Sequence, residues 1–193
     1  MLRAFVFNRT SVLVRHWFEI DLGDSSMEHG ARVELRLLDV QPHRGTESAA
    51  QRFVVDRPVW RADLFDRLSG TPGAFEVAHH HPKFDGVEPC ARAYLDEAPW
   101  DWLPRQLADI GAVCEAGGVP RAEVAEDVAE VRDHAAEIVA AAQAFAPTRC
   151  TSNDRCYRWT SDVAESVRLM IATTQSPHLL DREHTAPWAE AAP

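Results

Sequence analysis

Three consecutive histidines, His79–His81, are the residues of this sequence best suited to chemistry. Apolar and polar side chains alternate up to this point, which predicts a strand. Because successive side chains of a strand point to opposite faces, His79 and His81 would share one face. Phe75 and Val77 mark that face as inward. Two imidazoles arranged in this way can bind one ion, and imidazole suits zinc, iron, copper or nickel.

Residues elsewhere in the chain can complete such a metal site. Asp85 and Glu88 lie on the loop that follows the histidines, where either can supply a carboxylate. His16 falls on the inward face of the first long predicted strand and can supply a third nitrogen. We therefore predict a site for a divalent zinc, iron, nickel or copper ion. Its candidate ligands are His79, His81, Asp85, Glu88 and His16.

The spacing around the histidines resembles the first metal-binding motif of the cupin family. Gly73 is followed by His79, His81 and Asp85 at the intervals of that motif. Asp85 stands where the family usually has glutamate, and Arg92 stands where its next glycine is expected. No second histidine motif follows, so the resemblance concerns local geometry and implies no activity.

The same histidines allow a second interpretation that needs no metal. Histidine titrates near neutral pH and can act as a general acid or base. A mixed-charge segment lies upstream and contains Asp56, Arg57, Arg61, Asp63, Asp66 and Arg67. A pocket of this composition can cleave a phosphodiester, as in small ribonuclease toxins. Surface ion pairs explain the same charges more simply.

A helical cluster offers a further set of candidate ligands. Asp127, Glu130, His134 and Glu137 recur at intervals that place them along one helical stripe. This stripe borders an apolar face, where solvated polar residues are expected. We interpret it as a solvent boundary of the helix.

Composition narrows the classes of function. The chain has 20 basic and 30 acidic residues, giving a formal net charge of −10. Nucleic-acid affinity depends on cationic side chains, so a nucleic-acid partner is not expected. No apolar run reaches the length of a membrane span, and the first residues do not form a signal peptide. We expect a soluble, cytoplasmic protein.

Cysteine spacing and loop motifs exclude several cofactor sites. None of the four cysteines forms a C-x-x-C pair, so no zinc knuckle or redox motif is predicted. Cys150 and Cys156 are close enough in sequence that a disulfide between them stays open. No glycine-rich phosphate loop is present, so no nucleotide cofactor is expected.

The periodicity of the sequence predicts an α+β fold. Alternating patterns predict about four antiparallel strands, at 11–22, 31–40, 51–56 and 74–81. The segment 58–68 is ambiguous, and its apolar spacing favours a short helix. Apolar stripes predict about three helices, at 103–116, 120–146 and 162–173.

We expect one domain over residues 1–175, with strands mainly in 1–98 and helices mainly in 99–175. The helices would cover one face of the sheet, and the other face would be solvated. Residues 176–193 would form a loosely ordered tail.

Two functional hypotheses are preferred to the ribonuclease hypothesis. The first is a metal-binding protein or metal-dependent enzyme that uses the His-x-His strand. The second is a non-catalytic binding protein, with a small molecule or a second copy of the chain as its partner. Whether the protein is an enzyme stays open, because no complete catalytic motif is present.

Overall fold

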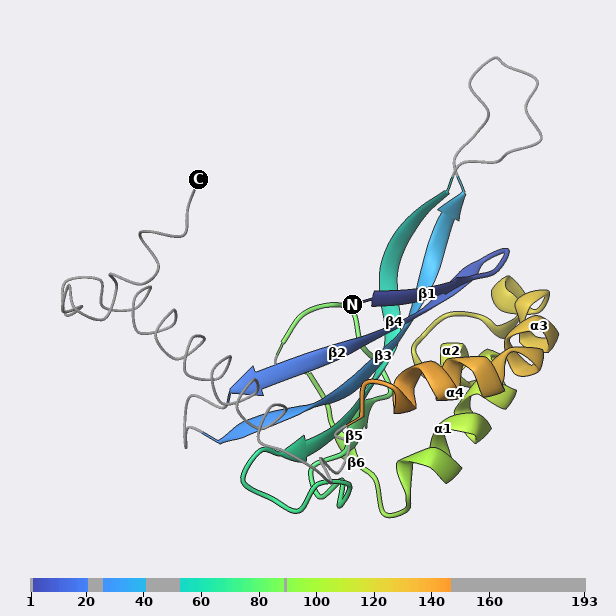
Figure 1. The fold of residues 1–193 in the computed structure, drawn as a ribbon. Coiled ribbons are helices and arrows are strands. Elements are labelled where there is room, and N and C mark those ends of the chain that lie inside the picture. Colours follow the sequence, from blue (N-terminus) through green and yellow to red (C-terminus); the bar gives the residue numbers. More distant parts are fainter. Residues whose placement is uncertain (1, 21–25, 41–52, 89, 147–193) are drawn as a thin grey trace, which may run out of the picture. The chain divides into compact units, whose positions relative to one another are not determined.

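Six antiparallel strands form one sheet in which each strand pairs with its neighbour along the chain (Figure 1). The computed structural model describes residues 2–20, 26–40, 53–88 and 90–146. All of these lie within one compact unit, Met1–Arg149. The strands are β1 (Leu2–Val6), β2 (Thr10–Ile20), β3 (Met27–Val40), β4 (Phe53–Arg67), β5 (His79–His81) and β6 (Ala93–Tyr94).

One face of the sheet is apolar because alternate residues of its long strands are hydrophobic. Val14 pairs with Val33, and Val33 pairs in turn with Ala62, so the three side chains form a row on the same face. All three are fully buried. Burying a side chain of this size contributes about 1.5–3 kcal/mol to folding. This row is the centre of the hydrophobic core.

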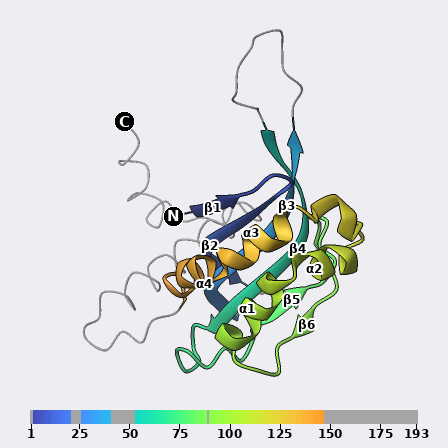
Figure 2. The same ribbon diagram turned by 90° about the vertical axis from the view of Figure 1, so that its right-hand side faces the viewer.

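Helices cover the apolar face, as two views at right angles show (Figures 1 and 2). Leu103, Ile110, Val131 and Ile138 are their fully buried contributions to the core. The helices are α1 (Pro99–Ala108), α2 (Ile110–Ala116), the 3₁₀ helix η1 (Arg121–Val124), α3 (Asp127–Asp133) and α4 (Ala135–Gln143).

The helical segments are shorter than the apolar stripes indicated. Asp109 ends α1 and caps α2, because its carboxylate accepts a hydrogen bond from the Ala112 N–H. His134 lies between α3 and α4. The expected helices at 103–116 and 120–146 are therefore each divided. The expected helix at 162–173 lies outside the described residues.

Asp127 ties the helices to the edge of the sheet. Its buried carboxylate accepts hydrogen bonds from the backbone N–H groups of Asn8, Arg9 and Thr10. The Thr10 hydroxyl donates a fourth bond, with an O···O distance of 2.7 Å. Asp127 thus holds the β1–β2 turn and is not the solvated residue that its stripe predicted.

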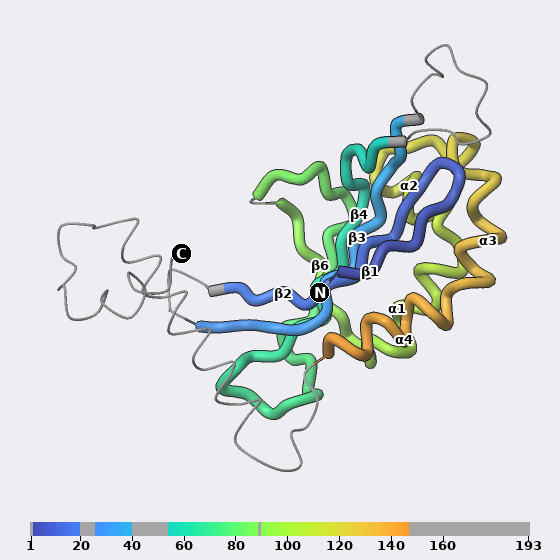
Figure 3. The backbone as a smooth tube through the Cα atoms, turned by 45° about the horizontal axis from the view of Figure 1, so that its top comes forward, coloured from blue at the N-terminus to red at the C-terminus, as the bar shows by residue number. Residues whose placement is uncertain are grey.

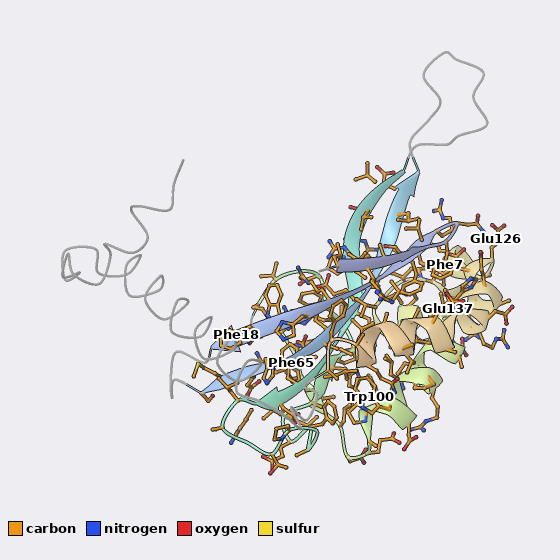
Figure 4. All side chains as sticks on the ribbon, in the orientation of Figure 1. Phe7, Phe18, Phe65, Trp100, Glu126 and Glu137 are labelled. Carbon is orange, nitrogen blue, oxygen red and sulfur yellow. The ribbon has the colours of Figure 1, made fainter. Side chains whose placement is uncertain are left out.

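The C-terminal end of β2 and the N-terminal end of β3, which pair with each other, extend beyond the helices (Figure 3). Phe18 and Phe65 lie toward this end of the sheet, away from Phe7 (Figure 4). Gly30 faces Phe65 across the ladder, and a Cβ atom at Gly30 would lie 2.2 Å from the Leu64 carbonyl oxygen. Close approach of β3 and β4 therefore requires glycine at this position.

The α+β class and the antiparallel sheet are confirmed, but several details differ. The sheet has six strands where about four were expected. The segment 58–68 is not a helix, because residues 58–67 belong to β4. Its alternating side chains, with Trp60 and Leu64 facing the core, satisfy a strand. The expected domain boundary at residue 175 lies outside the described residues.

In the described part of the chain, no helix is both long and apolar enough to cross a bilayer.

The expected strand at 74–81 is reduced to β5, since Phe75 has a φ of 53° and cannot continue a strand. The two residues that were to mark the inward face therefore lie outside the sheet.

Candidate metal centre

His79 and His81 share one face of the sheet, but it is the face opposite the helices. His80 pairs with Ala62 of the core row and therefore points toward the helices. Its ring centroid lies 5.0 Å from that of Trp102. His79 and His81 are buried, as expected of an inward face, but this face is not the one that the helices cover. Strand alternation correctly placed His79 and His81 on one face. The direction of that face was inferred from Phe75 and Val77, which lie outside β5.

The face that carries His79 and His81 is buried here rather than solvated. Asp63 pairs with His79 across the β4–β5 ladder, and Arg61 pairs with His81. Asp63 and His81 are 0% exposed and His79 is 2% exposed. Arg32 lies opposite Asp63 on β3 and is also buried. A polar network therefore replaces the open sheet surface that was expected.

Asp63 is the centre of this network. The Arg32 Nε atom donates to Asp63 Oδ1 at 2.5 Å, and Arg32 Nη2 lies 3.2 Å from Oδ2. Arg61 Nε donates to Oδ2 at 2.8 Å. Two guanidiniums thus hold one carboxylate, which fixes its orientation relative to the histidines.

The environment keeps Asp63 ionised. Burial acts to raise the pKa of Asp63, but the guanidiniums of Arg32 and Arg61 outweigh it and lower the pKa to about 2. A carboxyl whose pKa is lowered contributes stability that is complete above its unfolded pKa and is lost as the pH falls through the folded value. At neutral pH Asp63 is therefore an anionic ligand.

His79 presents a free lone pair to Asp63. Its Nδ1 atom donates to the Val77 carbonyl oxygen at 2.8 Å. Burial lowers the pKa of His79, so the ring is neutral and Nε2 carries the lone pair. This Nε2 atom is buried and has no hydrogen-bond partner among the described residues. It lies 3.5 Å from Asp63 Oδ2.

His81 uses both ring nitrogens. The Arg61 Nη2 atom lies 2.8 Å from His81 Nε2. Because arginine only donates hydrogen bonds, Nε2 is the acceptor and Nδ1 carries the proton. Nδ1 lies 2.8 Å from the sulfur of Cys90. His81 Nε2 is also 3.4 Å from Asp63 Oδ2.

Three potential ligand atoms therefore converge on one point. They are Asp63 Oδ2, His79 Nε2 and His81 Nε2, and each lies within 4.8 Å of the others. A tetrahedral ion with metal–ligand distances of about 2.1 Å separates its ligand atoms by about 3.4 Å. The measured separations of 3.5 Å and 3.4 Å from Asp63 Oδ2 match this spacing. This group can hold a metal ion.

Aromatic rings surround the three side chains. The Phe65 ring contacts His79 edge to face, with 6.4 Å between centroids, and the Tyr94 ring lies 5.6 Å from His79. The Phe84 ring lies 5.7 Å from His81 and also stacks on the Arg61 guanidinium at 4.3 Å. These rings exclude water, which strengthens electrostatic interactions among the enclosed groups.

The other candidate ligands are placed elsewhere. His16 lies on the helix-facing side of the sheet beside His29, with 5.8 Å between ring centroids. Asp85 is exposed and accepts a hydrogen bond from the Val87 N–H. Neither belongs to the group around Asp63. Glu88 bonds to Arg61 and to Cys90, and so lies in a second group that also contains His81.

Asp63 and Cys90 were not among the predicted metal ligands. Asp63 belonged to the mixed-charge segment, which was interpreted as surface ion pairs. Its alternation with Ala62 and Leu64 could have placed it on the face opposite the core. The partner strand could not be identified in this way, because pairing across residues 68–78 is a long-range property.

Comparison of the chain with protein-family models, with curated proteins and with solved structures gave no match.

Proposed function

We propose that this protein binds one divalent transition-metal ion through Asp63, His79 and His81. Imidazole nitrogens and a carboxylate form a ligand set that suits zinc or iron(II). The separations of 3.4 Å and 3.5 Å between ligand atoms favour a tetrahedral ion and hence zinc. Two histidines and one carboxylate are also the ligands of many catalytic zinc sites.

The observation that carries this proposal is the unpaired Nε2 atom of His79. A buried acceptor without a donor costs about 1–3 kcal/mol. Here that acceptor also faces the ionised Asp63 carboxylate, 3.5 Å away. A cation between the two atoms removes both penalties. The hydrogen bond from Nδ1 to the Val77 carbonyl is the outer contact that usually orients a metal-binding histidine.

The charges around the site indicate what accompanies the ion. Arg32 and Arg61 contact Asp63, and their outer partners are Glu19 and Glu88. Arg92 contacts Glu19 as well, at 3.5 Å. These three cations and three anions balance, so a dication adds uncompensated positive charge. An ion held by these three residues would therefore favour an anionic substrate or ligand over a neutral one.

Binding of the ion also requires a local rearrangement. Arg61 Nη2 donates a hydrogen bond to His81 Nε2. Because this nitrogen has only one lone pair, it cannot accept that bond and bind an ion at the same time. This side chain must turn away from His81 before the ion is bound. Its contact with Glu88 offers it an alternative partner nearer the solvent.

The same arginine supports a second candidate function, in which the network is structural and the protein is a non-catalytic binding protein. In that case Arg61 and Arg32 satisfy Asp63 permanently and hold β3, β4 and β5 together. The buried ion pairs would then specify strand register rather than recruit an ion. The two functions differ in whether the isolated protein takes up metal.

Metal analysis of the purified full chain distinguishes them. The protein is stripped with a chelator, incubated with excess zinc, desalted and analysed by mass spectrometry for zinc and iron. The measurement is made in a Cys90→Ser chain, because Cys90 belongs to the second group around His81 and could bind zinc by itself. In this chain we expect about one zinc ion, and much less when Asp63→Asn or His79→Asn is added. Asp63→Asn preserves side-chain size and removes the charge, whereas His79→Asn shortens the side chain and removes the ligating ring nitrogen.

The matched control is His16→Asn, which removes a half-buried histidine from the opposite face. This variant should retain wild-type zinc. Equal zinc in the Cys90→Ser chain with and without Asp63→Asn, with both proteins folded by circular dichroism, would overturn the proposal. The structural function would then be favoured.

A further inference from the structure

We propose a second, outer metal position formed by His81 Nδ1, Cys90 Sγ and a Glu88 carboxylate oxygen, which takes a thiophilic divalent ion such as zinc or its probe cobalt. It uses the opposite nitrogen of His81 from the inner site. No residue other than His81 is common to the two positions. The outer position therefore stands or fails separately from the proposed function.

The three groups converge on the outer side of the His81 ring. Cys90 Sγ lies 2.8 Å from His81 Nδ1 and 3.3 Å from Glu88 Oε2. All three potential ligand atoms lie within 4.8 Å of one another. Thiolate, imidazole and carboxylate are all established zinc ligands, with metal–ligand distances of about 2.0–2.3 Å. Small side-chain shifts would place an ion between them.

Accessibility distinguishes this position from the inner one. Glu88 is exposed and Cys90 is partly exposed, whereas Asp63 and His79 are buried. The outer groups can therefore meet an ion from solution without opening the sheet. Glu88 also holds Arg61, the residue that occupies the inner lone pair of His81. An ion that binds Glu88 withdraws this partner from Arg61.

The single histidine couples the two positions. A neutral imidazole has one lone pair, located on Nε2 in the present hydrogen-bond arrangement. Outer binding moves the proton of His81 to Nε2 and gives Nδ1 the lone pair. Inner binding requires the reverse tautomer. Occupation of one position therefore disfavours the other unless His81 loses its second proton and bridges two ions.

Binding at the outer position releases one proton. The Cys90 thiol loses its proton to solvent as the metal–sulfur bond forms, since the thiolate is the ligand. Cysteine ligation also gives this position a spectroscopic signature. Cobalt bound to a thiolate shows a near-ultraviolet charge-transfer band, whereas cobalt bound by nitrogen and oxygen alone does not.

Cobalt titration of the metal-free full chain tests the proposal. The titration is performed without oxygen, in a buffer that contains a phosphine reductant and no thiol. We expect a thiolate charge-transfer band in the wild type and its loss in the Cys90→Ser variant. Glu88→Gln should retain the band but need about 10-fold or more cobalt to reach it. Asp85→Asn, an exposed acid on the same loop, should behave as wild type.

The inner-site variant separates the two proposals. Asp63→Asn should keep the thiolate band even though it loses inner binding. Absence of the band from wild type at saturating cobalt would overturn the outer position. Persistence of the band in Cys90→Ser would do so as well, because another cysteine would then be the source. Neither result bears on zinc uptake through Asp63.

Discussion

His79 lies directly opposite Asp63 across the β4–β5 ladder, and its Nε2 atom is 3.5 Å from Asp63 Oδ2. This pairing places an unprotonated nitrogen against an ionised carboxylate inside the protein. In a metal-free chain the two atoms repel each other. A cation between them would turn the same geometry into a binding site.

Zinc should stabilise the folded protein. A ligand that binds the folded state at 100 times its dissociation constant adds about 2.7 kcal/mol to the free energy of unfolding. For a unit of this size we expect Tm to rise by about 5–10 °C. Differential scanning calorimetry with zinc and with a chelator measures the shift. An equal rise in Asp63→Asn would show that zinc acts elsewhere.

Arg61→Met should increase zinc affinity while weakening the metal-free fold. The substitution frees His81 Nε2 and removes a positive charge beside the ion. We expect zinc affinity to increase about tenfold, equivalent to about 1.4 kcal/mol. Breaking the buried ion pair should lower the metal-free stability by about 3 kcal/mol. Chelator-competition titration and urea unfolding measure the two effects.

Arg36→Met is the matched control for this variant. Arg36 lies on β3 and bonds to Glu34 and to the Asp56 carbonyl, without contacting Asp63. Its removal should leave zinc affinity unchanged. Weaker zinc binding in a folded Arg61→Met protein would contradict competition between the arginine and the ion.

The stability of the metal-free protein should fall as the pH drops below about 6.5. Burial lowers the pKa of His16, with the adjacent His29 adding to the effect, and burial also lowers the pKa of His29. A histidine with a lowered folded pKa contributes stability above its unfolded pKa of about 6.5, which is lost as the pH falls through the folded value. Urea unfolding across this range, with chelator present, measures the slope.

His16→Gln should reduce that pH dependence. The variant removes one titrating ring and relieves its charge repulsion with His29. The unfolding free energy should then fall less steeply between about pH 6.5 and 5. A slope identical to that of wild type would indicate that other histidines, such as His80, whose pKa burial also lowers, account for the effect.

Asp127→Ala should destabilise the fold without affecting metal binding. The change removes the acceptor of the backbone N–H groups of Arg9 and Thr10, and Thr10 is buried. Leaving buried donors unsatisfied should cost about 3 kcal/mol. Glu130→Ala, an exposed acid on the same helix, should change stability by less than about 0.5 kcal/mol. Similar urea midpoints for the two variants would refute this role.

Local patterns in the amino-acid sequence were enough to indicate the fold class and part of the site. Alternation in 11–22 and 31–40 predicted β2 and β3, because a sheet with one apolar face needs every second residue hydrophobic. The same periodicity placed His79 and His81 on a common face. Apolar stripes predicted helical structure after residue 99, although they could not show the breaks at Asp109 and His134.

Contacts between distant segments required the folded chain. Asp63 meets His79 and His81 because β5 pairs with β4 in one particular register, and a shift by one residue would turn both histidines to the other face. His16 was expected near them but lies on the opposite side of the sheet. Side-chain period is a local consequence of strand geometry, whereas strand partner and register depend on the packing of the whole sheet against its helices.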